Sequence, residues 1–185
     1  MVRTRFPLLG ERLALDLVNT RVSRGGRTAD LLATPAALDD WLRAESAHLS
    51  WHTDATRQDL ESFRMLRDAI ASLLSAHRAG GTPDPLALTT VNDALADAPA
   101  THLGWGTDGA QLSPGASQRK QSLRLVASDA VELLTGAERR LVRTCAHPDC
   151  VLQFVATNPR RRWCSSAGCG NRARVARNYA RQHAG

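Results

Sequence analysis

The sequence lacks several features that would assign it to a membrane or secreted class. No apolar run approaches the ~20 residues that a membrane-spanning helix needs, so we expect a soluble protein. The first nine residues contain two arginines but no apolar stretch of the kind found in a signal peptide. We therefore expect a cytoplasmic protein in a reducing compartment. The 185 residues, without internal repeats or long low-complexity linkers, suit one domain or a larger domain with a small appendage.

Common enzyme motifs are absent as well. The sequence contains no His-Glu-x-x-His spacing, no phosphate loop and no Gly-x-Ser-x-Gly elbow, and no pair of carboxylates occurs in a catalytic setting. We therefore predict that the protein is not an enzyme. The only residues that support an enzymatic alternative are Asp16 and Asn19, near the N-terminus.

Cysteine is scarce and is confined to the C-terminal part. The four cysteines lie within 25 residues, as Cys145-x4-Cys150 and, after thirteen intervening residues, Cys164-x4-Cys169. Two close pairs joined by a short arm can place four thiolates tetrahedrally around one zinc ion. A disulfide framework disagrees with a reducing compartment, and unrelated buried cysteines would seldom cluster so closely. We predict structural Zn²⁺, because four thiolates leave no coordination position for a catalytic water.

Positive charge is concentrated in the same region. The whole chain has a formal charge of +6. Residues 138–185 contain ten arginines and two acidic side chains, which gives +8, whereas the other 137 residues carry 14 basic and 16 acidic groups. Four zinc-bound thiolates and the ion together reduce the charge of the C-terminal part to about +6. This asymmetry favours a polyanionic partner, and the planar fork of arginine suits phosphates and guanine edges.

The hydrophobic pattern of residues 1–137 predicts a helical body. Apolar residues recur at helical spacing after Gly10, after Thr34, from about Thr56 to Gly80, after the prolines near Asp84, and over residues 123–134. Residues 101–113 break this pattern, and two short runs around residues 106–109 predict a small hairpin. Residues 21–27, rich in glycine and arginine, are expected to form a mobile loop. We therefore expect a mainly α fold with a body of residues 1–137 and a zinc module of residues 138–185.

The zinc module is predicted to begin with a strand and a knuckle. Residues 141–144 are a strand candidate that runs into the first cysteine pair. Residues 146–149 contain proline and aspartate, which are natural in the turn between two ligands. His147 in this turn is expected to be exposed, because four thiolates already complete the metal shell.

A β-hairpin and a helix are predicted to follow. Residues 151–155 are β-prone and are expected to pair with residues 161–163, which would deliver Cys164 beside Cys150. A helix is expected from about Cys169 to His183, so that its positive dipole end lies near the zinc–thiolate centre. The order of knuckle, hairpin and helix is similar to a treble clef.

The predicted C-terminal helix has two faces when it is plotted at 100° per residue. Arg172 falls on the face of Cys169 and Val175, and we predict that it supports the zinc site by bonding knuckle carbonyls or a carboxylate. The opposite face carries a basic stripe. Together with the arginines before Cys164, this stripe provides the residues predicted to contact nucleic acid, with base readout from Arg174, Arg177 or Asn178. The full set is Arg160, Arg161, Arg162, Arg174, Arg177, Asn178 and Arg181.

Two segments resemble known families. Cys-x4-Cys, the stretch Arg-Arg-Arg-Trp-Cys and the run Cys-Gly-Asn-Arg before a basic helix resemble the CGNR zinc-finger family. Residues 15–20, Leu-Asp-Leu-Val-Asn-Thr, resemble the opening of the helical ABATE domain, which accompanies this finger and is described as a stress-induced transcription regulator. The resemblance covers essentially the whole chain. It implies a zinc-binding, DNA-binding regulator with ligands Cys145, Cys150, Cys164 and Cys169, supported by Gly170, Asn171 and Arg172.

One polar group in the body is a candidate ligand pocket. Asp16, Asn19 and Thr20 lie at i, i+3 and i+4 and share one face of a helix. They could form the floor of a pocket for a small-molecule effector, which would make the protein a sensor. The alternative is that they cap or cross-link the helix end, as such side chains often do.

Two functions fit these features. The first is a cytoplasmic transcription regulator whose helical body senses an effector or forms a homodimer, and whose arginine-rich module binds DNA. The second is a zinc-stabilised module that binds RNA or protein without sequence-specific DNA binding. Sequence-dependent binding to duplex DNA separates them. A homodimer is expected because one short module reads too few base pairs for genomic specificity.

Overall fold

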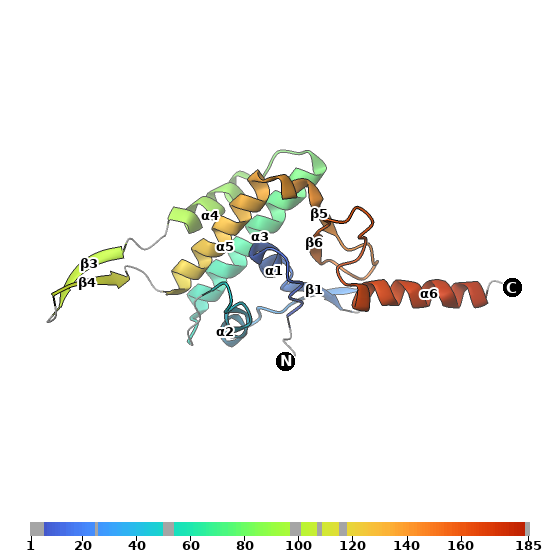
Figure 1. The fold of residues 1–185 in the computed structure, drawn as a ribbon, viewed down its shortest axis with the longest axis horizontal. Helices are drawn as coiled ribbons and strands as arrows, with labels where there is room; N and C mark the ends of the chain where they lie inside the picture. Colours follow the sequence, from blue (N-terminus) through green and yellow to red (C-terminus); the bar gives the residue numbers. More distant parts are fainter. Residues whose placement is uncertain are drawn as a thin grey trace.

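The computed structural model describes residues 6–24, 26–49, 54–96, 101–106, 109–114 and 118–183. These residues form a helical body and three two-stranded sheets (Figure 1). Four cysteines cluster in the C-terminal part. The mainly α fold expected from the hydrophobic pattern is therefore confirmed. No described helix is both long and apolar enough to cross a bilayer. The helices of the body are α1 (Leu13–Val18), α2 (Pro35–Ala44), α3 (Arg57–Ala79), α4 (Pro85–Ala96) and α5 (Gln118–Thr135).

Capping residues determine where α2 and α3 begin. The side chain of Thr34 accepts a hydrogen bond from a backbone amide of the first turn of α2, and Pro35 occupies the first helical position. Thr56 and Asp59 form a reciprocal capping box at the start of α3. Gly80 ends α3 in the left-handed conformation, with φ of 63°. These ends agree with the predicted boundaries.

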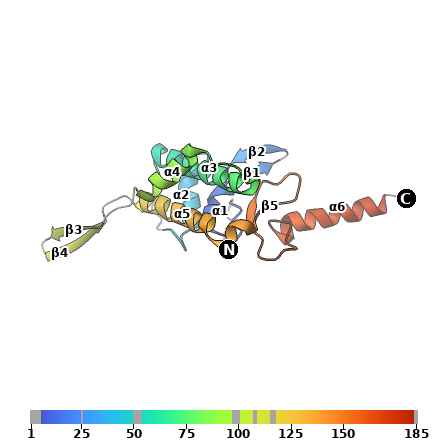
Figure 2. The ribbon, with the colours of Figure 1, turned by 90° about the horizontal axis from the view of Figure 1, so that it is seen from above.

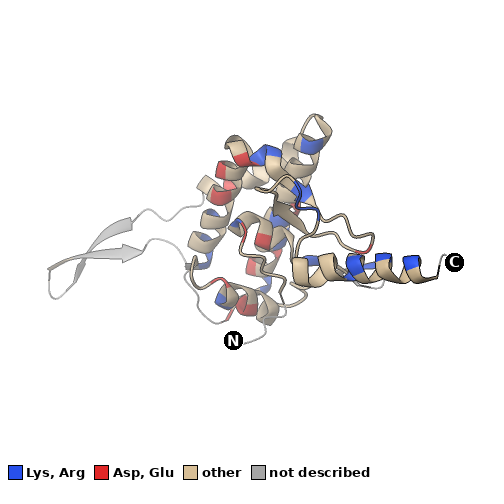
Figure 3. Ribbon diagram, turned by 45° about the vertical axis from the view of Figure 1, so that its right-hand side comes forward, with Lys and Arg blue, Asp and Glu red and all other residues tan. Residues whose placement is uncertain are grey.

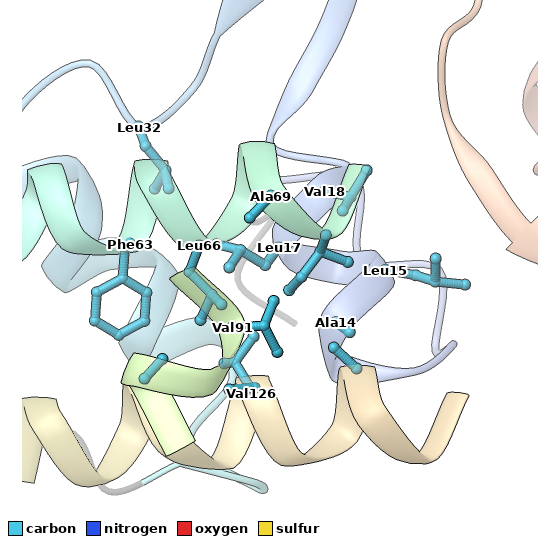
Figure 4. Packing of buried hydrophobic residues seen from close by; sticks show 14 of the residues in the cluster. Ala14, Leu15, Leu17, Val18, Leu32, Phe63, Leu66, Ala69, Val91 and Val126 are labelled. Carbon is cyan, nitrogen blue, oxygen red and sulfur yellow. The ribbon is translucent and has the colours of Figure 1, made fainter. Parts of the chain in front are cut away.

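The short helix α1 lies at the centre of the core. All residues from 14 to 20 are buried, and α1 packs against both α3 and α5. Figure 4 shows apolar side chains of α1, α3, α4 and α5 converging on one cluster. Trp41 of α2 meets Phe63 of α3 edge to face, with ring centroids 5.9 Å apart. Each large side chain buried in this way contributes about 1.5–3 kcal/mol to stability.

Residues 21–30 form an antiparallel hairpin of β1 (Arg21–Arg24) and β2 (Arg27–Asp30), so the prediction of a loop at residues 21–27 was wrong. A partly buried ion pair holds the end of this hairpin against α3. Arg67 of α3 donates two hydrogen bonds to Asp30, at 2.6 and 2.9 Å, and a third to Thr20. Because Arg67 is only 1 % exposed, its charge must be compensated, and Asp30 at the end of β2 provides the compensation.

The predicted second hairpin consists of β3 (Thr101–Gly106) and β4 (Gly109–Pro114). The strands pair antiparallel, from Thr101 opposite Pro114 to Gly106 opposite Gly109. The predicted turn residues 107 and 108 lie outside the described residues.

The C-terminal module continues from a 3-10 helix (Ala137–Leu141) into β5 (Val142–Thr144), β6 (Gln153–Val155), a π turn (Ser166–Gly170) and α6 (Asn171–Gln182). The predicted strand at residues 141–144 is confirmed, but its partner is β6. Residues 161–163 form no strand, so the predicted pairing of residues 151–155 with residues 161–163 was wrong. The backbone of this segment makes one bond to the knuckle instead, from Ala146 N to Arg162 O.

The strand β6 serves two hydrophobic clusters at once. Val155 and its cross-strand partner Val142 belong to the core of the body, whereas Phe154 belongs to the cluster around the cysteines. Successive side chains of a strand point to opposite faces, so three residues suffice to join both clusters. Pairing with β5 fixes the orientation of β6, so that Val155 faces the core of the body and Phe154 faces the cysteines.

Polar contacts also attach the module to the body. Asn19 Nδ2 donates to Gln153 O at 2.9 Å, and Gln153 N donates to Asn19 Oδ1 at 2.8 Å. Arg78 of α3 donates to Gln153 Oε1 at 2.6 Å. Glu11 accepts from Val155 N at 3.1 Å. Beyond these contacts, α6 extends away from the body, as two perpendicular views show (Figures 1 and 2).

Candidate metal centre and basic surface

Short loops position the four cysteines. Cys145 directly follows β5, and its amide donates to Leu152 O at 2.9 Å, which continues the β5–β6 pairing by one bond. Cys150 closes the knuckle turn by donating to His147 O at 3.0 Å. Cys169 lies in the π turn, where Ser165 Oγ accepts a hydrogen bond from Gly168 N at 3.1 Å.

The four sulfurs form one compact cluster, with all Sγ atoms within 4.8 Å of one another. The Sγ atoms of Cys150 and Cys164 are 3.9 Å apart, and those of Cys164 and Cys169 are 3.6 Å apart. Two thiolates bound to zinc at about 2.3 Å with a tetrahedral angle would lie about 3.8 Å apart, whereas a disulfide would need about 2 Å. The cysteines are free thiols, and their spacing suits Zn²⁺.

The electrostatics of the cluster favour a bound cation. Burial raises the pKa of Cys150 to about 11, and it also raises the pKa of Cys164. Burial acts in the same direction on Cys169, but hydrogen bonds from Arg172 and the neighbouring thiols lower the pKa of this thiol below its ordinary value. Without metal, therefore, Cys150 and Cys164 resist ionisation. Zn²⁺ supplies the positive charge that deprotonates coordinating thiols.

Arg172 contacts the metal centre directly. Its Nη2 donates a hydrogen bond to Cys169 Sγ at 3.0 Å, whereas the predicted carbonyl or carboxylate partner is not found among the described residues. The rest of its helix face does not cover the cysteines. Val175 and Tyr179 on that face are 60 % and 63 % exposed.

The two residues before Arg172 play different parts. Gly170 is buried, and a Cβ at this position would lie 3.3 Å from both Ser165 O and Trp163 Cδ1. Asn171 is exposed and begins α6, where its backbone amide donates to Gly168 O. A side chain at position 170 would therefore crowd the Trp163 ring beside the π turn.

The helix α6 presents a basic stripe on an exposed surface (Figure 3). No residue of α6 is buried, and a hollow of about 470 Å³ runs along it. Within the described residues no carboxylate pairs with the arginines of this stripe, which donate hydrogen bonds to backbone carbonyls. The residues that line the hollow are Arg174, Val175, Arg177, Asn178 and Arg181.

The three arginines before Cys164 have separate environments. Arg161 is half-buried, forms an ion pair with Glu11 at 2.7 Å and lies 4.3 Å over the ring centre of Phe154. Its guanidinium also donates to Cys164 O at 2.9 Å. Arg160 and Arg162 are exposed, and Arg162 lies 5.3 Å over the Trp163 ring. Two of the three guanidinium groups thus remain open to a partner, while Arg161 ties the module to the body.

The predicted pocket residues of the body all have partners inside the protein. Asn19 holds β6, and Thr20 donates to Leu17 O while accepting from Arg67. Asp16 accepts from Leu9 N at 3.3 Å, and burial raises its pKa to about 6. An effector pocket at Asp16, Asn19 and Thr20 stays a prediction.

Sequence reasoning missed Gln153, Glu11 and Arg78, which help to attach the zinc module to the body. Gln153 is the one polar side chain inside the predicted strand 151–155, and this is a usable signal, because a polar residue inside a buried strand needs a partner. Glu11 and Arg78 have no such signal, since both are ordinary charged residues near helix ends.

Family models match both parts of the chain. Residues 11–137 match the ABATE model, described as "Putative stress-induced transcription regulator", and residues 141–182 match the CGNR zinc finger. These descriptions are those of a regulator and a zinc finger, which implies a role other than catalysis. No curated protein matches the chain. The first match spans more than half of the chain, so the protein belongs to the ABATE family and carries a C-terminal CGNR zinc finger.

Proposed function

We propose that the protein is a cytoplasmic transcription regulator that binds DNA through α6. Cys145, Cys150, Cys164 and Cys169 bind one structural Zn²⁺, which fixes the start of α6 on the knuckle. The observation that carries the proposal is the exposure of α6 on every side, together with its stripe of arginines that lack acidic partners in the described structure. A helix with its side chains is about 10–12 Å wide, and the major groove of B-DNA is about 12 Å wide.

Different residues contribute affinity and specificity in this proposal. Arg160, Arg162 and Arg181 bind backbone phosphates, which supply most of the salt-dependent affinity. Arg174, Arg177 and Asn178 reach base edges, because arginine pairs bidentately with guanine and asparagine with adenine. Arg161, included in the predicted contact set, is less accessible because Glu11 neutralises it.

We also propose different roles for residues 1–137 and residues 138–185. The helical body senses an effector or forms a homodimer, and the zinc module contacts DNA. A dimer would double the number of base pairs read, which a single module of this size needs for genomic specificity.

The test is selection of the zinc-loaded protein against a random duplex DNA library, with binding repeated at two salt concentrations. An enriched, palindromic motif supports a dimeric regulator. A variant with Arg174→Gln, Arg177→Gln and Arg181→Gln should lose this binding. A control with Arg27→Gln, Arg124→Gln and Arg140→Gln removes the same charge from other exposed positions and should bind nearly as wild type.

The alternative is an RNA- or protein-interaction module in which zinc only holds the shape. Recovery of no motif, with weak binding that both triple variants reduce equally, would favour this alternative. Such a result would mean that the arginines act through net charge alone.

A further inference from the structure

A cavity of about 520 Å³ lies where the helical body meets the zinc module. One wall is the segment before α1, and the other is the stretch that leads into Cys164 and the π turn. Leu8 packs against the core of the body, whereas Leu9 packs against the cysteine cluster. The cavity therefore spans the boundary between the two hydrophobic clusters.

One side of the cavity is apolar. Leu8, Leu9 and the Trp163 indole all line it. Gly170 lies beside the indole, since a Cβ there would be 3.3 Å from Trp163 Cδ1, and Arg162 lies 5.3 Å over the ring. The indole and the two leucines offer an apolar surface against which an aromatic ligand can pack.

The other side carries positive charge. Arg160 and Arg162 line the cavity, are exposed and have no carboxylate partner among the described residues. Arg161 also lines it, but Glu11 neutralises this charge at 2.7 Å. Two uncompensated guanidinium groups beside an apolar wall attract an anion more strongly than either feature alone.

We propose that this junction cavity binds a small aromatic anion. Its ring system packs against Leu8, Leu9 and Trp163, and its carboxylate or phosphate group accepts hydrogen bonds from Arg160 and Arg162. Volumes of this size accommodate small organic ligands and exclude a DNA duplex, whose diameter is about 20 Å. The occupant is therefore a free small molecule. It shares Arg160 and Arg162 with the phosphate contacts proposed above, whereas the proposed base contacts lie on α6.

The position suits an effector. A ligand in the cavity touches the body through Leu8 and the zinc module through Trp163 and Ser166. Ser166 O in turn accepts a hydrogen bond from Arg174 of α6 at 3.3 Å. One wall of the cavity thus continues directly into the basic helix.

The experiment titrates the zinc-loaded full-length protein with 1-naphthoate by isothermal titration calorimetry. A Kd of about a millimolar or tighter is expected for a ligand of this size. Acetate has the charge without the ring, and 1-naphthalenemethanol has the ring without the charge; each should bind at least about tenfold more weakly. Intermolecular NOEs should connect naphthalene protons with the methyl groups of Leu8 and Leu9.

Two double variants complete the test. Arg160→Gln with Arg162→Gln should weaken 1-naphthoate binding at least about tenfold, because both charge-assisted hydrogen bonds are lost. Arg177→Gln with Arg181→Gln removes the same charge from α6 and should leave the Kd within twofold. Circular dichroism and zinc content confirm that both variants are folded. Absence of saturable binding, equal weakening in both variants, or equal affinity for acetate and 1-naphthoate would overturn the proposal.

Discussion

Arg172 donates a hydrogen bond from Nη2 to the Sγ atom of Cys169, three residues earlier, across 3.0 Å. The pair joins the first turn of α6 to the metal centre. Because the guanidinium is positive, the contact favours the thiolate form of Cys169, and Cys169 raises the pKa of Arg172 in return. Arg172 therefore differs from the other arginines of α6, which face outward.

Replacement of Arg172 should weaken the metal site. Arg172→Ala is expected to lower zinc affinity about 10–100-fold, the usual effect of removing a residue that orients a metal ligand. Competition with a chromophoric chelator measures this affinity, and thermal unfolding should show a lower Tm. Arg181→Ala, on the same helix but bonded only to Arg177 O within α6, should retain wild-type zinc affinity. A stable Arg172→Ala protein with normal zinc affinity and lost DNA binding would show that Arg172 contacts DNA instead.

The paired hydrogen bonds between Asn19 and Gln153 should hold the module against the body. Asn19→Ala leaves the buried backbone N–H and C=O of Gln153 without partners, at a cost of about 2–4 kcal/mol in unfolding free energy. Urea unfolding measures the loss, and amide exchange at Gln153 should become faster. Asn92→Ala, at an exposed position of α4, is the control and should change stability by less than about 0.5 kcal/mol. Equal stability of the two variants would contradict a role for Asn19 in this joint.

Gly170 should be intolerant of any side chain. A Cβ at this position would lie 3.3 Å from the backbone oxygen of Ser165 as well as from the Trp163 ring. We expect Gly170→Ala to destabilise the zinc-loaded protein by about 1–3 kcal/mol, the usual cost of overpacking. Gly168→Ala tests the same turn, but its nearest neighbours would be at ordinary contact distances of 3.5 and 3.6 Å. Thermal unfolding of both proteins should therefore show a clearly lower Tm for Gly170→Ala alone.

Two buried carboxyl groups should make stability depend on pH. Burial, with a contribution from the charge of Asp16, raises the pKa of Glu45 to about 7, and burial raises the pKa of Asp16 to about 6. The atom Oε1 of Glu45 is buried without a hydrogen-bond partner in the described structure. Both folded-state pKa values exceed the unfolded ones, so the folded protein holds protons that the unfolded chain releases. The unfolding free energy should therefore fall as pH rises from about 4 to about 7.

Replacement of Glu45 measures how much this residue contributes to the pH dependence of the unfolding free energy. Glu45→Gln stays neutral at every pH, so at pH 8 it should be more stable than wild type by roughly 2–3 kcal/mol, and this advantage should vanish near pH 4.5. Urea unfolding of both zinc-loaded proteins at several pH values measures the difference, in which any contribution of the metal site cancels. Glu61→Gln, at an exposed position, should change nothing. A pH-independent difference between Glu45→Gln and wild type would refute the assignment.

The elements predicted correctly are those governed by local rules. The helix starts at Thr34 and Thr56 follow from capping side chains within the first turn, and the end at Gly80 follows from the left-handed backbone conformation. The strand candidate at residues 141–144 corresponds to β5 at Val142–Thr144. The errors concern partners: β6 pairs with β5 and not with residues 161–163, and residues 21–30 form a hairpin because Arg67 binds Asp30 from a distant helix.

The spacing of four cysteines within 25 residues was enough, by itself, to predict the metal cluster, because short loops limit how far apart the ligands can lie. The concentration of arginine at the C-terminal end was equally visible. The helical plot already separated Arg172 from the basic stripe of α6, but only the tertiary structure showed which group each guanidinium contacts. Arg172 meets a thiolate, Arg161 meets Glu11 from the far end of the chain, and the stripe on α6 meets no carboxylate among the described residues. Charge is a property of the residue, but its compensation depends on contacts between distant segments.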